Sequence, residues 1–279
     1  MITAFLIFAR EVLEGTLLVS IMLAYLAKTG QSRYRKPVML GVLAAVAVSV
    51  AGAAIIYHTV RAYVDTPLQS VVEGVTYMLA AAILTGMTFW MRSESRHLSG
   101  DLRARIDAAT ASGRSTSAVL FSLALMSVGR EGLETAVLTV AIVMVTPFGQ
   151  FAGGALLGTL LALGMAYAIF AMGQRLDLGR FLSTLGILLM FFAAGLLINA
   201  VQDFQALGWV QIGQHVLWNS QNIVSTQTVF GDILHSFLGY TAHPTALQVL
   251  TYAVYMGAVL LAWRFAGGVS AARRSTKSA

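Results

Sequence analysis

The chain of 279 residues contains no cysteine, and charged residues make up only 11% of it. The absence of cysteine excludes disulfides, thiolate metal sites and thiol chemistry, so any metal site must use oxygen or imidazole ligands. The scarcity of charge accompanies a hydrophobic content of 57% and a mean hydropathy of +0.76. A soluble domain of this length does not have such a composition. The chain is therefore predicted to be an integral membrane protein.

Three patterns that would indicate other classes of protein are also missing from the sequence. No Walker-type nucleotide-binding loop is present, which argues against direct ATP hydrolysis by this chain. No His-Glu-x-x-His spacing occurs and no apolar stretch has a central histidine, which argues against an intramembrane metalloprotease. No lysine or arginine precedes the first apolar stretch, as it would in a signal peptide. We expect a retained first span and a protein that is not an enzyme.

Apolar stretches of about 20 residues recur seven times along the chain. This is the length that crosses about 30 Å of hydrocarbon at about 1.5 Å per helical residue. The predicted fold class is thus an all-α integral membrane protein with seven transmembrane helices. The spans are approximately residues 2–27, 38–58, 68–91, 118–145, 149–172, 181–203 and 247–266.

Lysine and arginine gather in alternate connections between these spans. The groups are Lys28, Arg33, Arg35 and Lys36; Arg92, Arg96, Arg103, Arg105 and Arg114; Arg175 and Arg180; and Arg264, Arg273, Arg274 and Lys277. The other connections carry only Arg61. The positive-inside rule therefore predicts an outside N-terminus and a cytoplasmic C-terminus, in agreement with an odd number of spans. Topology also explains the net charge of +6, and no nucleic-acid partner is expected.

One pattern, Arg-Glu-x-x-Glu, lies in the middle of two of the apolar stretches, at residues 10–14 and again at 130–134. An ionised side chain near the bilayer centre costs at least about 2.5 to 3.5 kcal/mol, so these charges need a compensating role. Residues three and four apart share a helix face, so each motif places two carboxylates on one side of its helix. The carboxylates are those of Glu11, Glu14, Glu131 and Glu134.

The two motifs also predict an inverted repeat within a single transmembrane permease domain. The first span runs from outside to inside and the fourth runs from inside to outside, so residues 1–91 and 118–203 form the two halves. Glu73-Gly74 can be aligned with Leu185-Gly186 as a weaker sign of the same repeat. The rest of the chain is predicted to consist of a cytoplasmic loop at 92–117 with one short helix, an external segment at 204–246, a last span at 247–266 and a tail at 267–279. Transporters with such repeats place their substrate between the halves at the midplane.

Four glutamates meeting across two helices, joined by Glu73, would form an oxygen-rich cage for a hard or borderline cation such as iron or manganese. Arg10 and Arg130 would support this cage by holding the carboxylates in position. Three alternatives remain open. The arginines could simply pair with Glu14 and Glu134 and pin two spans together, they could bind an anion coupled to proton transfer, or the chain could be a non-transporting membrane subunit. The surplus of carboxylates favours a cation.

Other polar residues have plainer interpretations. Glu73 lies near the outer interface, either as a headgroup-level carboxylate or on the outer approach to the site. Asp203 ends the sixth span and is expected to be a solvated helix end, with a place where the ion enters as the alternative. Solvated or structural roles are expected for the residues His215, His235, His243 and Asp232 of the external segment. Close helix approach is expected at the glycines Gly41, Gly52, Gly153, Gly154 and Gly158.

Taken together, these features resemble the oxidase-dependent iron transporters, a family that includes fungal high-affinity iron permeases and bacterial Efe-type iron permeases. The two Arg-Glu-x-x-Glu strings are similar to the family's paired motifs, and Val72-Glu73-Gly74 is similar to its Glu-Gly site in the third span. Residues 235–250, with Gly239-Tyr240 and Pro244-Thr245, are similar to the stretch before the last span of bacterial members. The resemblance covers the whole chain.

This resemblance implies iron uptake across the cytoplasmic membrane, with iron as a transported substrate and not a cofactor. It implies that the motif glutamates line the iron path. It also implies a functional partner, either an oxidase or a periplasmic or extracellular protein that delivers iron. The motifs fit ferric and ferrous iron equally well, and another divalent metal such as lead or manganese remains an alternative.

Overall fold

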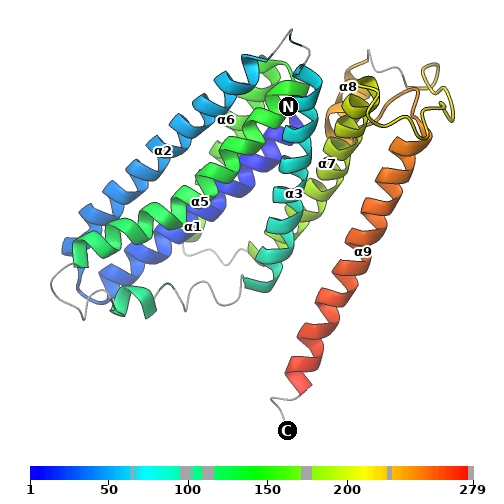
Figure 1. Ribbon diagram of the computed structural model, residues 1–279. Coiled ribbons are helices and arrows are strands. Elements are labelled where there is room, and N and C mark those ends of the chain that lie inside the picture. The colour runs from blue at the N-terminus through cyan, green and yellow to red at the C-terminus, as the bar shows by residue number, and fades with distance from the viewer. Residues whose placement is uncertain are drawn as a thin grey trace. The chain divides into compact units, whose positions relative to one another are not determined.

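The computed structural model describes residues 1–63, 66, 68–94, 102, 104–108, 116–170, 178–224 and 228–275. Within these residues the chain is helical and contains no named strand, only an isolated bridge between Val216 and Thr245. The all-α class predicted from the sequence is confirmed. The elements are α1 (Ile2–Lys28), η1 (Ser32–Tyr34), α2 (Arg35–Arg61), α3 (Gln69–Glu94), α5 (Thr116–Val145), α6 (Phe148–Phe170), α7 (Leu178–Ala206), α8 (Val229–Leu238) and α9 (Ala246–Ser275) (Figure 1).

Five of the described helices are long and apolar enough to cross a membrane, namely α2, α3, α6, α7 and α9. Each coincides with a stretch that the sequence predicts as a span. The other two predicted spans coincide with α1 and α5, which are long helices but carry the three charges of an Arg-Glu-x-x-Glu motif in their interior. Composition therefore identifies five spans, and the crossing of the membrane by α1 and α5 stays a prediction.

The chain divides into two compact units, described separately here. Unit 1 comprises residues 1–64 and 94–185 and contains α1, α2, α5 and α6. Unit 2 comprises residues 65–93 and 186–279 and contains α3, most of α7, α8 and α9. The first two long helices of each predicted half therefore pack together in unit 1.

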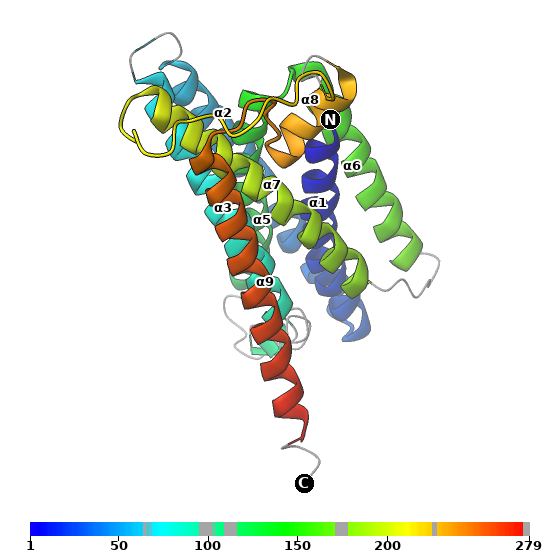
Figure 2. The same cartoon turned by 90° about the vertical axis from the view of Figure 1, so that its right-hand side faces the viewer.

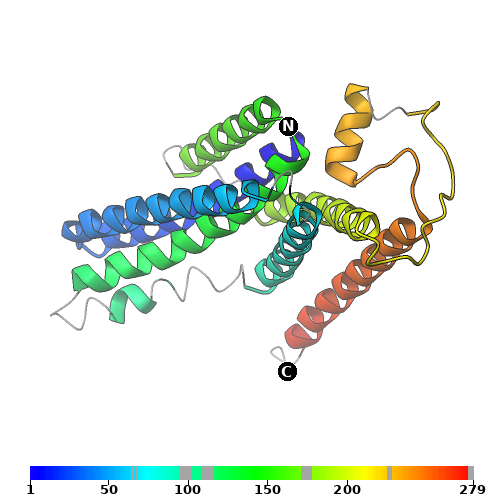
Figure 3. The ribbon, with the colours of Figure 1, turned by 45° about the horizontal axis from the view of Figure 1, so that its top comes forward.

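In unit 1, α2 packs along α5 and α1 packs along α6, while α1 also contacts α5. Figures 1 and 3 show α1 and α5 running side by side in opposite directions. The two main pairs meet in the same way, through a glycine laid against the start of the partner helix. A side chain at Gly41 of α2 would meet the Phe121 carbonyl and Ala124 of α5. A side chain at Gly154 of α6 would meet the Met1 carbonyl and Ala4 of α1, which are the positions 120 residues earlier.

Further glycines bring the helices of unit 1 close together. Gly158 lies against the Phe5 carbonyl, and Gly132, inside the second motif, lies against Ser49 of α2. The predicted role in close helix approach is thus confirmed for Gly41, Gly154 and Gly158. It is wrong for Gly153, where a Cβ would have no atom of another described element within 4 Å. At Gly52 the nearest atom is Leu133 Cδ2 at 3.4 Å, an ordinary contact.

An apolar cluster closes one end of unit 1. Its buried members are Met22, Leu26, Val38, Leu102, Ile106, Leu120 and Ala124. Leu102 and Ile106 belong to the connection that was expected to be a solvated loop with a short helix, and residues 104–108 are indeed helical. The Tyr25 hydroxyl also donates to Asp107 at 2.7 Å. The helical part of this connection is therefore packed onto the helix ends, because burying its apolar residues stabilises the fold.

In unit 2, α3 and α7 meet through one glycine from each helix. A Cβ at Gly74 would lie 3.0 Å from the Phe204 ring, and one at Gly186 would lie 2.9 Å from Thr88 Cγ2. Helices α3 and α9 both appear in Figure 2, and a hydrogen bond of 2.7 Å between the Thr85 and Tyr255 hydroxyls joins them. Gly74 and Gly186 are the glycines that the sequence comparison of the halves laid on each other, and both serve close approach.

Helix α8, in the predicted external segment, ends at Gly239. This residue has a φ of 67°, a left-handed conformation that glycine adopts without strain. Its backbone also touches Gly195 of α7, so a side chain at either position would meet backbone atoms. The Gly239-Tyr240 pair singled out in the sequence therefore forms a helix cap and a close contact between α8 and α7.

Candidate functional site

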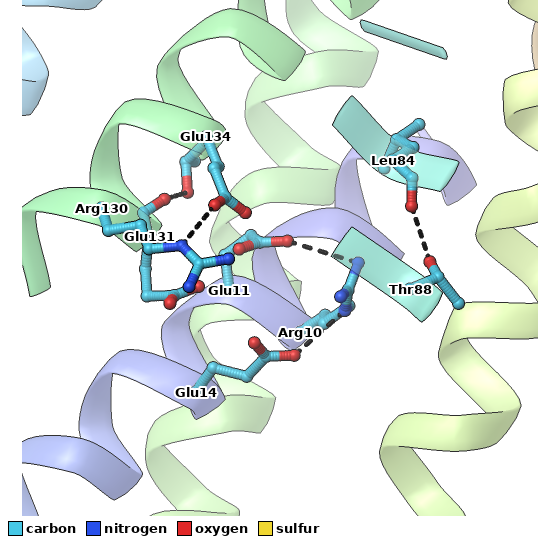
Figure 4. A network of polar contacts seen from close by, with 9 residues as sticks. Arg10, Glu11, Glu14, Leu84, Thr88, Arg130, Glu131 and Glu134 are labelled. Carbon is cyan, nitrogen blue, oxygen red and sulfur yellow. Dashed lines mark hydrogen bonds and ion pairs between the residues drawn. The ribbon is translucent and has the colours of Figure 1, made fainter. Parts of the chain in front are cut away.

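The two Arg-Glu-x-x-Glu motifs come together where α1 and α5 run past each other (Figure 4). One carboxylate oxygen from each of Glu11, Glu14 and Glu131 lies within 4.8 Å of the other two. All three residues are buried. Side chains 120 residues apart thus form a single acidic cluster, as the sequence predicted for these three.

Each arginine is held by the last glutamate of its own motif. Arg10 Nε donates to Glu14 Oε1 at 3.0 Å, and Arg130 Nε donates to Glu134 Oε1 at 2.9 Å. Arg10 NH1 also lies 3.7 Å from Glu11 Oε1. The pairs have the same spacing of four residues, which places both partners on one helix face. The two halves of the site therefore share one local geometry.

The two pairs differ sharply in exposure. The side chains of Arg10 and Glu14 are 2% and 7% exposed, whereas those of Arg130 and Glu134 are 41% and 16% exposed. A buried ion pair loses its hydration and depends on its own contacts more than a partly exposed pair does. The repeat of the motif in sequence therefore gives two unequal sites in space, with the more deeply buried pair on α1.

Several carboxylate oxygens of the cluster are buried and have no hydrogen-bond partner among the described residues. These atoms are both oxygens of Glu11, Oε2 of Glu131 and Oε2 of Glu134. Burying an ionised oxygen without a partner is costly, and such a group requires a proton, a cation or water. The cluster therefore has open coordination positions, and most of them lie on Glu11 and Glu131.

A cavity of about 700 Å³ within unit 1 includes these two carboxylates. Glu11 and Glu131 both line it, whereas Glu14 and Glu134 do not. Most of the wall is apolar, with valines from α1, α2 and α5. The arrangement separates two kinds of glutamate. Glu11 and Glu131 face the cavity with open oxygens, and Glu14 and Glu134 bind the arginines.

Hydroxyl groups supply the other oxygens along the cavity, and sequence reasoning missed all of them. The residues are Thr16, Ser20, Ser49, Thr135, Thr139 and Tyr167. A signal was available on α5, because Thr135 and Thr139 follow Glu131 at intervals of four residues and so share its helix face. Serine and threonine are common in membrane helices, and spacing from a motif carboxylate is what distinguishes these.

The cluster has the charge and donors for a hard cation. Four ionised motif glutamates and two arginines sum to 4 − 2 = 2 negative charges, counted from the sequence. Oxygen ligands suit hard divalent ions. Opposite ligands around an octahedral ion with bonds of about 2.1 Å stand about 4.2 Å apart, slightly less than the 4.8 Å spread found here.

The structure places two further predicted residues in unit 2. Glu73 accepts a hydrogen bond of 2.8 Å from Gln69 Nε2. Asp203 is partly buried beside Gly74, and its Oδ2 has no hydrogen-bond partner among the described residues. The expectation that Asp203 is a solvated helix end is therefore wrong for this oxygen, because α3 packs against α7 at this turn. Glu73 belongs to a different unit from the motif glutamates, and its place in one shared cage stays a prediction.

The histidines of the external segment show no metal-binding arrangement among the described residues. His235 Nδ1 forms a hydrogen bond of 2.8 Å with the Tyr240 carbonyl, which is a structural role as expected. His215 is exposed, and His243 lines a cavity of about 350 Å³ whose wall is largely glutamine and threonine. The side chain of Asp232 lies outside the described residues.

Comparison with known proteins gives one family and a set of relatives. The model of the iron permease FTR1 family matches residues 1–273. The protein named ferrous iron permease EfeU of Escherichia coli O6:H1 is 31% identical over 268 residues, covering 94% of this chain and 95% of the relative. The protein of the same name from Yersinia pestis is 32% identical over 261 residues, covering 92% and 90%. No solved structure matches the chain.

Proposed function

The chain belongs to the iron permease FTR1 family, and on this premise we propose that it moves ferrous iron into the cell through the Glu11 and Glu131 site. Family membership and the apolar helices make it a multi-pass protein of the cytoplasmic membrane, and a transporter of iron and not an enzyme. Ferrous iron is the cargo named for the relatives from Escherichia coli and Yersinia pestis.

The observation that carries the proposal is the pair of carboxylates from antiparallel helices that share one cavity. Glu11 and Glu131 are each buried, each carries an oxygen without a hydrogen-bond partner among the described residues, and both line the same space. A cation between them would supply a partner for the open carboxylate oxygens of both helices at once. Because oxygen ligands alone bind Fe²⁺ less tightly than imidazole or thiolate sites, the ion could also leave.

The arginines support this role by their charge. With one Fe²⁺ bound, the two surplus negative charges of the four motif glutamates are neutralised. Arg10 and Arg130 each hold a glutamate through Nε. They therefore orient the carboxylates of Glu14 and Glu134 and reduce repulsion among the four motif glutamates. This engagement weakens the alternative in which the arginines bind an anionic substrate.

The matched contacts of unit 1 support the inverted repeat. Gly41 meets Phe121 and Ala124 as Gly154 meets Met1 and Ala4, so the contacted residues of α5 and α1 are related by the same offset as the motifs, although the two glycines are not. We infer that α1 and α5 cross the membrane with their charges at mid-depth, giving seven spans and an outside N-terminus. Glu73 and Asp203 would then lie on the outer approach.

The test is influx of radioactive Fe²⁺ into proteoliposomes under reducing conditions. We expect Glu11→Gln and Glu131→Gln each to abolish influx, because each removes one carboxylate of the shared site. Asp107→Asn is the matched control, since it removes an exposed carboxylate outside the cavity. Transport by both glutamine variants at the wild-type rate would contradict the proposed site, and inhibition by phosphate but not by Mn²⁺ would restore the anion alternative.

A further inference from the structure

We propose that two pairs of hydroxyl side chains form the steps by which the cation reaches and leaves the carboxylates: Thr135 and Thr139 on α5, and Thr16 and Ser20 on α1. This inference rests on the proposed function and adds the path on either side of the Glu11 and Glu131 site. All four hydroxyl residues line the cavity that contains the two glutamates.

On α5 the hydroxyls continue directly from the carboxylate. Glu131, Thr135 and Thr139 are spaced four residues apart, so they form one line along a helix face. From Glu131 to Thr139 the helix rises about 12 Å. On α1, Thr16 and Ser20 are likewise four residues apart and lie beyond Glu11 toward the end of the helix. Each helix therefore carries two oxygen steps that begin near its own glutamate.

The two lines extend in opposite directions because α1 and α5 are antiparallel (Figures 1 and 3). Both lines start at the level where the glutamates meet. With an outside N-terminus, the α5 pair lies on the outer side of the carboxylates and the α1 pair lies on the cytoplasmic side. Together they cover the two directions that an ion must travel.

Local hydrogen bonds orient two of these hydroxyls, one on each helix, to bind a cation. Thr135 Oγ1 donates its hydrogen to the Glu131 carbonyl at 2.7 Å, and Thr16 Oγ1 donates to the Val12 carbonyl at 2.8 Å. A hydroxyl has one hydrogen and two lone pairs. Because the hydrogen is engaged with the helix backbone, lone pairs remain for an ion in the cavity.

The rest of the cavity wall makes these oxygens important. Side chains such as Val19, Val46 and Val128 offer no ligand. A partly dehydrated cation in this apolar space would otherwise lose water ligands without replacement, which is costly. Neutral hydroxyl oxygens replace some of those ligands but bind less strongly than carboxylates. Weak steps beside a stronger site permit the ion to move on.

The test compares the double variants Thr135→Val with Thr139→Val and Thr16→Val with Ser20→Ala in the same Fe²⁺ influx assay. We expect each to lower the maximal rate about fivefold, the effect of losing a modest polar interaction in the crossing. Equilibrium binding of Fe²⁺ to the carboxylates should stay unchanged. Thr59→Val is the matched control, because Thr59 makes the same backbone bond, to the Ile55 carbonyl at 2.8 Å, outside the cavity.

Serine variants separate the hydroxyl from the threonine shape. Thr135→Ser with Thr139→Ser should retain most influx, whereas Thr135→Ala with Thr139→Ala should lose most influx. If the valine pair fails to fold, this comparison tests whether the hydroxyls carry the ion. If both double variants without hydroxyls transport Fe²⁺ at the wild-type rate while Glu11→Gln does not, the hydroxyl path is wrong and the proposed function stands. Wild-type influx in Glu11→Gln as well would overturn the proposed function.

Discussion

At the scale of single residues, the four motif glutamates divide into two roles that their identical spacing does not reveal. Glu11 and Glu131 face the cavity with open oxygens, while Glu14 and Glu134 hold the arginines. The sequence predicts that two carboxylates share each helix face, since that follows from helical periodicity. It does not predict which of them faces a partner helix, because that depends on how α1 and α5 are rotated against each other.

The unequal burial of the two arginines gives a prediction for stability. Glu14→Gln should destabilise the protein by about 3 kcal/mol, because it leaves the buried Arg10 guanidinium without its closest carboxylate. Glu134→Gln should cost less, because the Arg130 side chain is 41% exposed and so depends less on this one carboxylate than the buried Arg10 does on Glu14. Thermal unfolding of the two variants in the same detergent would measure the difference. Equal losses would contradict the unequal burial of the two pairs.

Glu11→Gln gives the opposite combination of effects. It removes a buried carboxylate whose oxygens have no hydrogen-bond partner among the described residues and whose ion pair with Arg10 is long, at 3.7 Å, so we expect the unfolding temperature to change little. Fe²⁺ influx should nevertheless be lost, because the variant lacks one ligand of the site. Unfolding and influx measured on one preparation would test both points, and a large loss of stability would instead indicate a structural role for Glu11.

At the scale of helices, the predicted spans agree with the observed elements to within a few residues for most ends, because the length of an apolar stretch decides where a helix lies in the chain. The α9 helix runs further, to Ser275, than the predicted end at 266. The contacts between helices are harder to predict from the sequence than the helix ends. Gly153 and Gly154 are neighbours in sequence, yet only Gly154 touches another helix. A glycine's contacts depend on which face of its helix meets a partner, and composition does not contain that information.

The matched helix pairs predict matched consequences of substitution. Gly41→Ala and Gly154→Ala should each destabilise the protein by about 1 to 3 kcal/mol, because the new methyl group would meet a backbone carbonyl of the partner helix. Gly153→Ala is the control, as open space surrounds that position. Denaturation midpoints in detergent would compare the three. If Gly41→Ala or Gly154→Ala had the same denaturation midpoint as Gly153→Ala, the close packing described for that helix pair would be wrong.

At the scale of the whole molecule, charge distribution predicts a topology that helical composition only partly tests. Five of the helices that the structure describes qualify as spans, while α1 and α5 do not because of the charges that are central to the proposed site. The same residues that indicate function thus keep α1 and α5 from meeting a criterion based on apolar length. Loop charges, which depend on the membrane and not on packing, are the information that predicts their crossing.

The absence of native cysteine makes this topology directly measurable. Single cysteines introduced at Ala108 and Gln150, on the two sides of α5, should differ in reaction with a membrane-impermeant maleimide in intact cells. We expect Gln150→Cys to be labelled from outside and Ala108→Cys to be protected, if α5 crosses from inside to outside as proposed. Both positions are exposed in the structure, so protection would reflect the membrane. Labelling of both from outside would contradict a crossing by α5.

The most direct measurement of the central claim is Fe²⁺ binding to the purified protein under reducing conditions, combined with iron X-ray absorption. We predict one bound ion per chain, with oxygen ligands and without the multiple scattering of imidazole. The ion should be lost in Glu11→Gln and equally in Glu131→Gln, because both helices hold it. Retention of the ion with unchanged absorption in either variant would contradict a site shared by the two motifs.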